Sequence, residues 1–155
     1  MAEDRAPIWP DGVVGSITHS GGFAAAAVAW AADIAALGID SEQIIDPAAA
    51  RDIADICMVD EPTLFKAAHG RSFCEFCTFV FSAKESVFKC LFPLMRKFFE
   101  FSDVRITSVD WNREYFTWTA ASEYIGAGRL SHADGFVHTS VELSSPHYDS
   151  RVATP

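Results

Sequence analysis

The stretch FSAKESVFK, residues 81–89, places one carboxylate and two ammonium groups in a run rich in phenylalanine. On a helix Glu85 and Lys89 are four residues apart and share a face, where a salt bridge contributes only ~0.2–0.5 kcal/mol. A second interpretation gives the same residues chemistry: Glu85 faces a metal ion while Lys84 and Lys89 face phosphate groups, for which lysine is an effective point charge. The stretch alone leaves both interpretations open.

A second acidic group lies upstream in GIDSE, residues 38–42. In a strand, Asp40 and Glu42 point to the same face, because side chains alternate with a period of two. Neighbouring carboxylates repel each other unless a cation lies between them, and Mg²⁺ accepts oxygen ligands while keeping positions for phosphate and water. Glu85 is the candidate third carboxylate. The alternative is that both acids are simply exposed in a turn that follows a strand.

The segment GSITHSGG, residues 15–22, sets small donors and a titratable group beside glycines. Ser16, Thr18 and His19 suit an anion-binding loop, and Arg5 is a further isolated cation upstream. A histidine in such a loop is more often an ordinary surface residue. A serine hydrolase using Ser16 and His19 is disfavoured, because the sequence has no GxSxG motif.

Four cysteines are too few for a disulfide scaffold in a chain of 155 residues. Cys74 and Cys77 form a CEFC pair with the spacing of zinc or redox motifs. A structural zinc site needs two more ligands, for which Cys57 or His69 are candidates. Reduced, half-buried thiols are the favoured interpretation, because a second CxxC pair is lacking.

Composition and charge restrict the possible classes of protein. Half of the residues are hydrophobic, which predicts one folded domain with a real core. The net charge of −9 argues against nucleic-acid binding. Charge is unevenly distributed: residues 66–97 hold six basic and two acidic side chains and so carry +4, against −13 in the rest. This segment would attract an anionic ligand or partner, or else form an ordinary solvated helix face.

The N-terminus lacks the basic and apolar regions of a signal peptide, and the run at residues 21–32 is too short to span a bilayer. We therefore expect a cytoplasmic protein with no transmembrane segment.

The elements that position these residues are predicted in two blocks. Helical patterns occupy residues 47–58, 61–68 and 73–99, the last of which should end or kink at Pro93. Short β-branched and aromatic runs then predict an antiparallel meander, with strands at 105–111, 114–120 and 135–143. Residues 7–12 form a turn, and residues 144–155 a loose tail. Alanine content alone predicts a helix over residues 23–40.

Three motifs together resemble a known family. RAPIWPDGVVGSITHS, then GIDSE, then FSAKESVFK occur in the order found in the 4′-phosphopantetheinyl transferases, and the resemblance extends to about residue 143. The chain is most similar to the enterobactin synthase component D-like type. The resemblance implies an α+β fold in which an antiparallel sheet packs against a long helix, with a pseudo-twofold arrangement and a truncated first subdomain. It also implies that residues 23–40 form a β-hairpin turning near Ala32 and Asp33.

The resemblance implies an Mg²⁺-dependent transfer of 4′-phosphopantetheine from coenzyme A to a serine of an apo acyl or peptidyl carrier protein. Asp40, Glu42 and Glu85 would hold the metal. Glu85, directly or through a water, would take the serine proton, and Lys89 would stabilise the departing 3′,5′-ADP.

Other matched positions would bind coenzyme A. His19, with Thr18 beside it, would hold the 3′-phosphate, Arg5 would add positive charge, and Lys84 and Lys89 would bind phosphate. The residue types at these positions agree with this role, because phosphoryl transfer needs charge neutralisation and alignment more than covalent help.

The chain departs from the family pattern at its start, since Met1 stands only four residues before Arg5. Residues 1–43 would be the remainder of the first subdomain, 44–143 the second subdomain and 144–155 the tail. The chain is then either a fragment or a genuinely short form, in which self-association would cover an exposed edge. A truncated, non-catalytic module that binds coenzyme A or a carrier protein is the alternative function.

Overall fold

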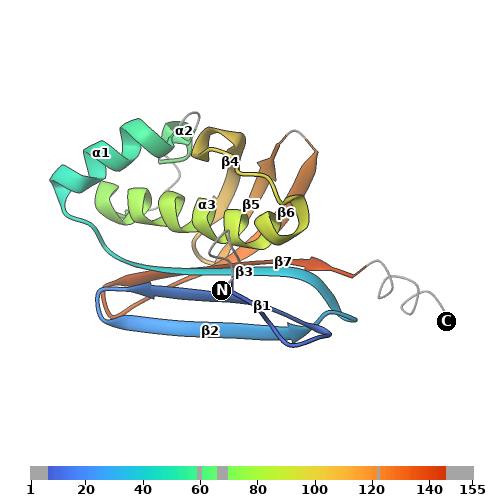
Figure 1. Ribbon diagram of the computed structural model, residues 1–155. Helices are drawn as coiled ribbons and strands as arrows, with labels where there is room; N and C mark the ends of the chain where they lie inside the picture. The colour runs from blue at the N-terminus through green and yellow to red at the C-terminus, as the bar shows by residue number, and fades with distance from the viewer. Residues whose placement is uncertain (1–6, 59–60, 66–69, 122, 146–155) are drawn as a thin grey trace.

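The computed structural model describes residues 7–58, 61–65, 70–121 and 123–145. A five-stranded antiparallel sheet has the order β3-β7-β6-β5-β4, and a separate antiparallel pair is formed by β1 and β2 (Figure 1). The strands are β1 Val13–Ser20, β2 Phe23–Trp30, β3 Ile34–Gln43, β4 Val104–Asp110, β5 Tyr115–Ala120, β6 Tyr124–Ala133 and β7 Phe136–Ser144. The helices are α1 Pro47–Cys57, α2 Pro62–Phe65, α3 Phe73–Met95 and the short 3₁₀ turn η1 Phe101–Asp103.

The long helix α3 has well-defined signals at both ends. A capping box begins it: the Glu75 amide donates to Ser72 Oγ at 3.2 Å, and the Ser72 amide donates to Glu75 Oε2 at 2.8 Å. The helix ends at Met95, two residues beyond Pro93, and Arg96 follows in the left-handed conformation with φ 49°. Pro93 thus lies inside the helix, which ends two residues later than a break at the proline predicts and four residues before the predicted end at residue 99.

The core lies between α3 and the five-stranded sheet. Aromatic side chains of the helix meet aromatic side chains of the sheet, with ring centroids 5.5 Å apart for Phe79 and Phe116 and 5.0 Å apart for Phe79 and Trp111. Phe79, Phe116 and Trp118 have no exposed surface. Helix and sheet thus form the α+β arrangement that the sequence predicted.

Residues 23–43 form strands despite their alanines, and the turn lies at residues 31–33 as expected. The predicted hairpin is nevertheless wrong, because the two strands do not pair with each other. β2 pairs with β1, and β3 pairs with β7 of the larger sheet. Tertiary pairing overrides helix propensity here, and it also separates two strands that are adjacent in sequence.

Strand β6 was not predicted, because its glycines weaken the strand pattern. A Cβ atom at Gly126 would lie 2.5 Å from the Trp118 ring, and one at Gly128 would collide with Phe116. The glycines therefore make room for the large aromatic side chains of β5. The sequence shows them only as turn residues.

The helix predicted over residues 47–58 and the predicted meander are also confirmed. Pro47 lies in the first turn of α1, where Asp46 accepts hydrogen bonds from two backbone amides. Strands β4, β5 and β7 coincide with the predicted meander, and β7 alternates buried and less buried residues. Residues 66–68 of the predicted second helix and the tail from residue 146 lie outside the described residues.

A close approach between β3 and α3 brings the motifs together. A Cβ atom at Gly38 would collide with the backbone oxygen of Ser86 and lie 2.6 Å from the amide of Cys90. The absence of a side chain at Gly38 therefore lets the FSAKESVFK turn of α3 lie directly over the GIDSE strand. No helix within the described ranges is long and apolar enough to cross a membrane.

Candidate functional site

A cavity of about 940 Å³ lies where β1, β3 and α3 meet. Six of the residues that the sequence singled out line it, and they come from all three elements: Thr18, His19, Asp40, Glu42, Glu85 and Lys89. Arg5 lies outside the described residues. The structure thus brings most of the predicted site into one place.

Hydroxyl groups join β1 to β3. The amide of Ile39 donates to Ser16 Oγ at 3.0 Å, and the amide of Ser41 donates to Thr18 Oγ1 at 3.0 Å. Ser20 Oγ donates to Glu42 Oε2 at 2.7 Å. Sequence reasoning missed Ser20, although serine and threonine at a period of two along residues 16–20 were a signal that one strand face carries hydroxyl groups.

Asp40 is the most buried acid of the cavity, with 2% of its surface exposed. The Lys89 ammonium lies 2.6 Å from Asp40 Oδ1, and Thr18 Oγ1 donates to the same oxygen at 3.3 Å. Asp40 Oδ2 is buried and has no hydrogen-bond partner among the described residues. Lys89 of α3 therefore forms its ion pair with Asp40 of β3. The structure records this pair in place of the intrahelical pair with Glu85.

Two further carboxylates have altered acidity. Burial raises the pKa of Glu42; the Ser20 hydrogen bond opposes this rise, and the charge of Asp40 adds to it. Burial also raises the pKa of Glu85; the charge of Lys89 opposes this rise, while Asp40 and Glu42 add to it. The three carboxylates are thus close enough to repel one another, which raises the proton affinity of Glu42 and Glu85.

These acids are suited to a divalent cation, although they are not arranged as a finished metal site. Within the described part of the chain, no group of three histidine, cysteine or acidic side chains converges on one point. Asp40 Oδ2 has no hydrogen-bond partner among the described residues, and the carboxylates repel one another. A bound cation would give this oxygen a partner and lower the repulsion. Oxygen donors are also the ligands that Mg²⁺ prefers.

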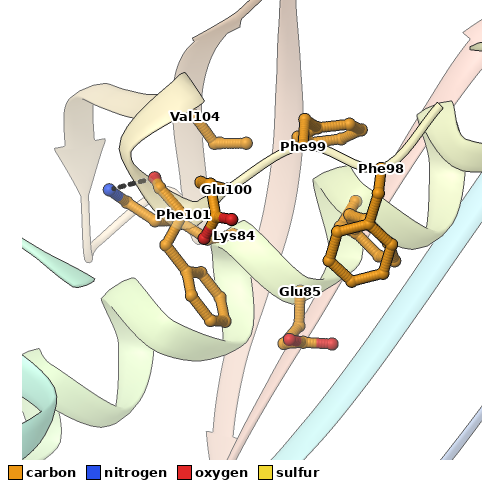
Figure 2. A pocket seen from close by; sticks show the side chains of 8 residues that line it. Lys84, Glu85, Phe98, Phe99, Glu100, Phe101 and Val104 are labelled. Carbon is orange, nitrogen blue, oxygen red and sulfur yellow. Dashed lines mark hydrogen bonds between the residues drawn. The ribbon is translucent and has the colours of Figure 1, made fainter. Parts of the chain in front are cut away.

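Lys84 does not line the large cavity, so its position does not support the expectation that it binds phosphate. Its side chain is fully buried, with Nζ 2.9 Å from Glu61 Oε1. It also donates to the backbone oxygens of Cys57 at 2.5 Å and Phe101 at 3.1 Å (Figure 2 shows the Phe101 bond). Because Lys84 and Glu85 are consecutive on a helix, they point in different directions, and only Glu85 reaches the large cavity.

Glu61 was missed in the sequence. It is fully buried, and its Oε1 also accepts a hydrogen bond from the amide of Ile106 at 3.1 Å. Burial alone would raise the pKa of Glu61, but the hydrogen bond and charge of Lys84 and the Ile106 amide outweigh it and lower this pKa. In the sequence, Glu61 is a single acid before Pro62, and no pattern indicates that it pairs with Lys84.

The other half of the cavity wall is apolar and was also not predicted. It is formed mainly by aromatic rings from α3, from the segment that follows α3 and from the segment before β1, namely Phe81, Phe88, Phe92, Phe98 and Trp9. Phe88 on α3 lies at the centre of a ring cluster, 5.3 Å from Phe92 and 5.2 Å from Phe98 between ring centroids. One cavity thus joins a charged wall to an aromatic wall.

The cysteines take no part in this site. Burial raises the pKa of Cys57 to about 11 and that of Cys77 to about 12, so both thiols are protonated at neutral pH. His69, a candidate zinc ligand, lies outside the described residues.

Two family models match the chain. The model of the 4′-phosphopantetheinyl transferase superfamily matches residues 36–141, and that of the 4′-phosphopantetheinyl transferase N-terminal domain matches residues 1–29. Among curated proteins, the chain is 37% identical over 154 residues to the 4′-phosphopantetheinyl transferase Svp of Streptomyces mobaraensis, covering 91% of this chain and 61% of Svp. It is 38% identical over 89 residues to enterobactin synthase component D of Escherichia coli strain K12, covering 57% of this chain and 41% of that protein.

Solved structures share the fold. The holo-[acyl-carrier-protein] synthase of Thermotoga maritima has a TM-score of 0.53 at 23% identity, covering 71% of this chain and 63% of that one. The Bacillus anthracis synthase, solved in complex with CoA (3′,5′-ADP), has a TM-score of 0.53 at 21% identity, covering 73% of this chain and 98% of that one. The chain spans about half the length of the curated relatives it matches.

Proposed function

The chain belongs to the 4′-phosphopantetheinyl transferase superfamily, and we propose that it transfers the 4′-phosphopantetheine group of coenzyme A to a serine hydroxyl of an apo acyl or peptidyl carrier protein. One observation supports this above all: residues of three separate sequence motifs line a single cavity large enough for a nucleotide-sized ligand.

The charged wall suits the phosphates of coenzyme A. Lys89 and His19 line the cavity and would face the anionic groups, and Thr18 offers a hydroxyl beside them. The Lys89 ammonium lies 2.6 Å from Asp40 Oδ1, and it would exchange part of that contact for a phosphate oxygen of coenzyme A. Arg5 is proposed to add charge at the 3′-phosphate from the adjoining segment.

Glu85 is suited to the proton transfer. Its pKa is raised by burial, and a carboxylate with a raised pKa is a stronger base that still sits in reach of a ligand in the cavity. The serine oxygen forms a bond to the β-phosphorus as the bond from that phosphorus to the bridging oxygen breaks. The serine proton passes to Glu85, directly or through a water, and 3′,5′-ADP leaves with its negative charge facing Lys89.

Asp40, Glu42 and Glu85 would hold Mg²⁺. The ion would supply positive charge to the pyrophosphate oxygens and lower the repulsion among the three acids. Asp40 Oδ2, which is buried and has no hydrogen-bond partner in the described part of the chain, supports this assignment. Calorimetric titration of coenzyme A with and without MgCl₂ tests it, since the ion should strengthen coenzyme A binding in the parent chain and much less in Asp40→Asn.

The first experiment is a mass spectrum of apo carrier proteins incubated with this chain, coenzyme A and MgCl₂. Transfer adds one phosphopantetheine to the carrier and requires Glu85, so Glu85→Gln should keep the fold and lose the product. Binding of coenzyme A without product, on fatty-acid and peptidyl carriers alike, would support the alternative of a non-catalytic binding module.

The proposal extends to the organisation of the protein. Residues 1–43 are proposed as the remainder of a first subdomain and residues 44–143 as the second, in a protein that acts in the cytoplasm. Self-association that covers an exposed edge stays a prediction, which size-exclusion chromatography would test.

A further inference from the structure

The turn between β1 and β2 contacts the larger sheet at two separate points. On its first side, Ser20 Oγ donates to Glu42 Oε2 at 2.7 Å. On its second side, the ring of Phe23 lies 5.1 Å from the ring of His138 on β7. We propose that Phe23 and His138 are positioning residues, which hold His19 at the end of β1 where it meets the 3′-phosphate of coenzyme A. The inference rests on the proposed function.

The two contacts lie on opposite faces of β3. Asp40 and Glu42 line the large cavity, so the side chain of Ser41 between them points to the other face of the sheet. His138 is directly opposite Ser41 in the register of β3 and β7, and its Nδ1 forms a hydrogen bond with Ser41 Oγ at 2.9 Å. The ring of Phe136 stacks on His138 at 6.0 Å. The turn therefore holds the edge strand β3 from both faces.

The backbone of the turn packs closely against the same strand ends. Gly21 and Gly22 have φ values of 54° and 85°, which glycine adopts without strain. A Cβ atom at Gly21 would lie 2.7 Å from Gln43 Oε1 and 3.3 Å from the Phe136 ring. The rings of Phe23 and Phe136 are 5.8 Å apart. The ring cluster of Phe23, Phe136 and His138 thus leaves the turn little freedom to move.

His19 lies between the fixed middle of β1 and this turn. The middle of the strand is held by the Ser41 amide, which donates to Thr18 Oγ1 at 3.0 Å. His19 lines the large cavity, whereas Phe23 and His138 do not, so these two can act on the ligand only through the turn. Because hydrogen bonds to a phosphate depend steeply on distance and angle, a small shift of the turn would weaken the contact that His19 makes.

Calorimetric titration with two ligands tests the inference. Coenzyme A and 3′-dephospho-coenzyme A differ only in the phosphate that His19 would meet, and each is titrated in MgCl₂ into the parent chain, Phe23→Ala and His138→Ala. Damage to the whole cavity would weaken both ligands, whereas a displaced His19 would weaken coenzyme A alone. Val28→Ala is the control, because Val28 lies on β2 like Phe23, is 62% exposed and does not line the large cavity.

We expect Phe23→Ala and His138→Ala each to lower the preference for coenzyme A over 3′-dephospho-coenzyme A about tenfold, the loss of one hydrogen bond to a charged group. The Kd for 3′-dephospho-coenzyme A should hardly change. The double variant should lose little more than either single variant, because both changes remove the same ring contact. Phe23→Tyr, which keeps the ring, and Val28→Ala should both keep the preference of the parent chain.

Other results would overturn the inference. Equal weakening of both ligands would show that the ring cluster only stabilises the fold, and an unchanged preference in either alanine variant would show that the turn is held without it. Neither result affects the proposed transfer. A parent chain that shows the expected binding but modifies no carrier would overturn the transfer and leave the inference standing. A parent chain that binds neither ligand would overturn both.

Discussion

Replacing Lys84 tests whether this residue anchors the helix or binds phosphate. The Lys84 ammonium has no exposed surface, and its partner Glu61 is equally buried. In Lys84→Met the carboxylate of Glu61 loses the positive charge beside it while staying in the interior. Breaking a buried ion pair in this way costs about 3–5 kcal/mol, because one charge is left without compensation.

The predicted loss of unfolding free energy is large enough to measure by urea unfolding, with the fluorescence of the buried Trp111 and Trp118 as the signal. For a chain of this size each kcal/mol shifts Tm by about 2–4 °C, so a decrease of roughly 6–20 °C is expected. Lys97→Met is the matched control, because Lys97 is exposed and its replacement should change the unfolding free energy by less than about 0.5 kcal/mol.

A double variant shows whether the lost stability comes from the unpaired charge of Glu61. Lys84→Met combined with Glu61→Leu removes both charges and should recover most of the stability lost in Lys84→Met, since apolar replacements of a whole buried pair are often neutral or better. If Lys84→Met instead kept its stability and bound coenzyme A more weakly, Lys84 would be a phosphate ligand and the anchoring argument would be refuted.

Three further predictions follow from the same geometry. Gly38→Ala should destabilise the fold by about 1–3 kcal/mol or more, and it should lower kcat, because the added Cβ collides with the backbone of α3. An undisturbed kcat would contradict the close-approach argument. The pKa of Glu61 is lowered from its usual 4.5, so its contribution to stability is complete above about pH 4.5 and is lost as the pH falls through the folded-state pKa. In Glu61→Gln the unfolding free energy should therefore fall less steeply as the pH is lowered. An unchanged dependence on acid pH would count against the ion pair. Burial raises the pKa of Cys57 to about 11 and those of Cys77 and Cys90 to about 12, so iodoacetamide at pH 8 should label the partly exposed Cys74 first by mass spectrometry, and early labelling of Cys90 would contradict its burial.

The site motifs were predictable because their chemistry is local. GIDSE presents Asp40 and Glu42 on one strand face, and the turn of α3 presents Glu85 and Lys89 together, so short spacings alone indicate which groups can meet. The hydroxyl groups of β1 follow the same rule. Each motif lies within one element, where backbone geometry fixes the direction of the side chains.

What the sequence did not indicate depends on contacts between distant segments. The partner of Lys84 lies 23 residues upstream at Glu61, beyond the reach of any periodic pattern. The pairing of β3 with β7 joins strands separated by about a hundred residues, which no local pattern indicates. The alanine content predicted a helix here, and the hairpin that the resemblance implied paired β3 with β2 instead. The glycines of β6 appear as turn residues until the aromatic rings of β5 that cover them are seen.

The adjacent residues Lys84 and Glu85 link stability to the candidate chemistry. Lys84 faces the interior and ties α3 to the end of α1 through Cys57 and to η1 through Phe101, which fixes the rotation of the helix about its axis. Gly38 independently fixes the distance between α3 and β3. With rotation and distance both set, Glu85 can face the cavity only where Asp40 and Glu42 already lie. Lys84 therefore acts on the candidate site by fixing the orientation of α3, which directs the neighbouring Glu85 into the cavity.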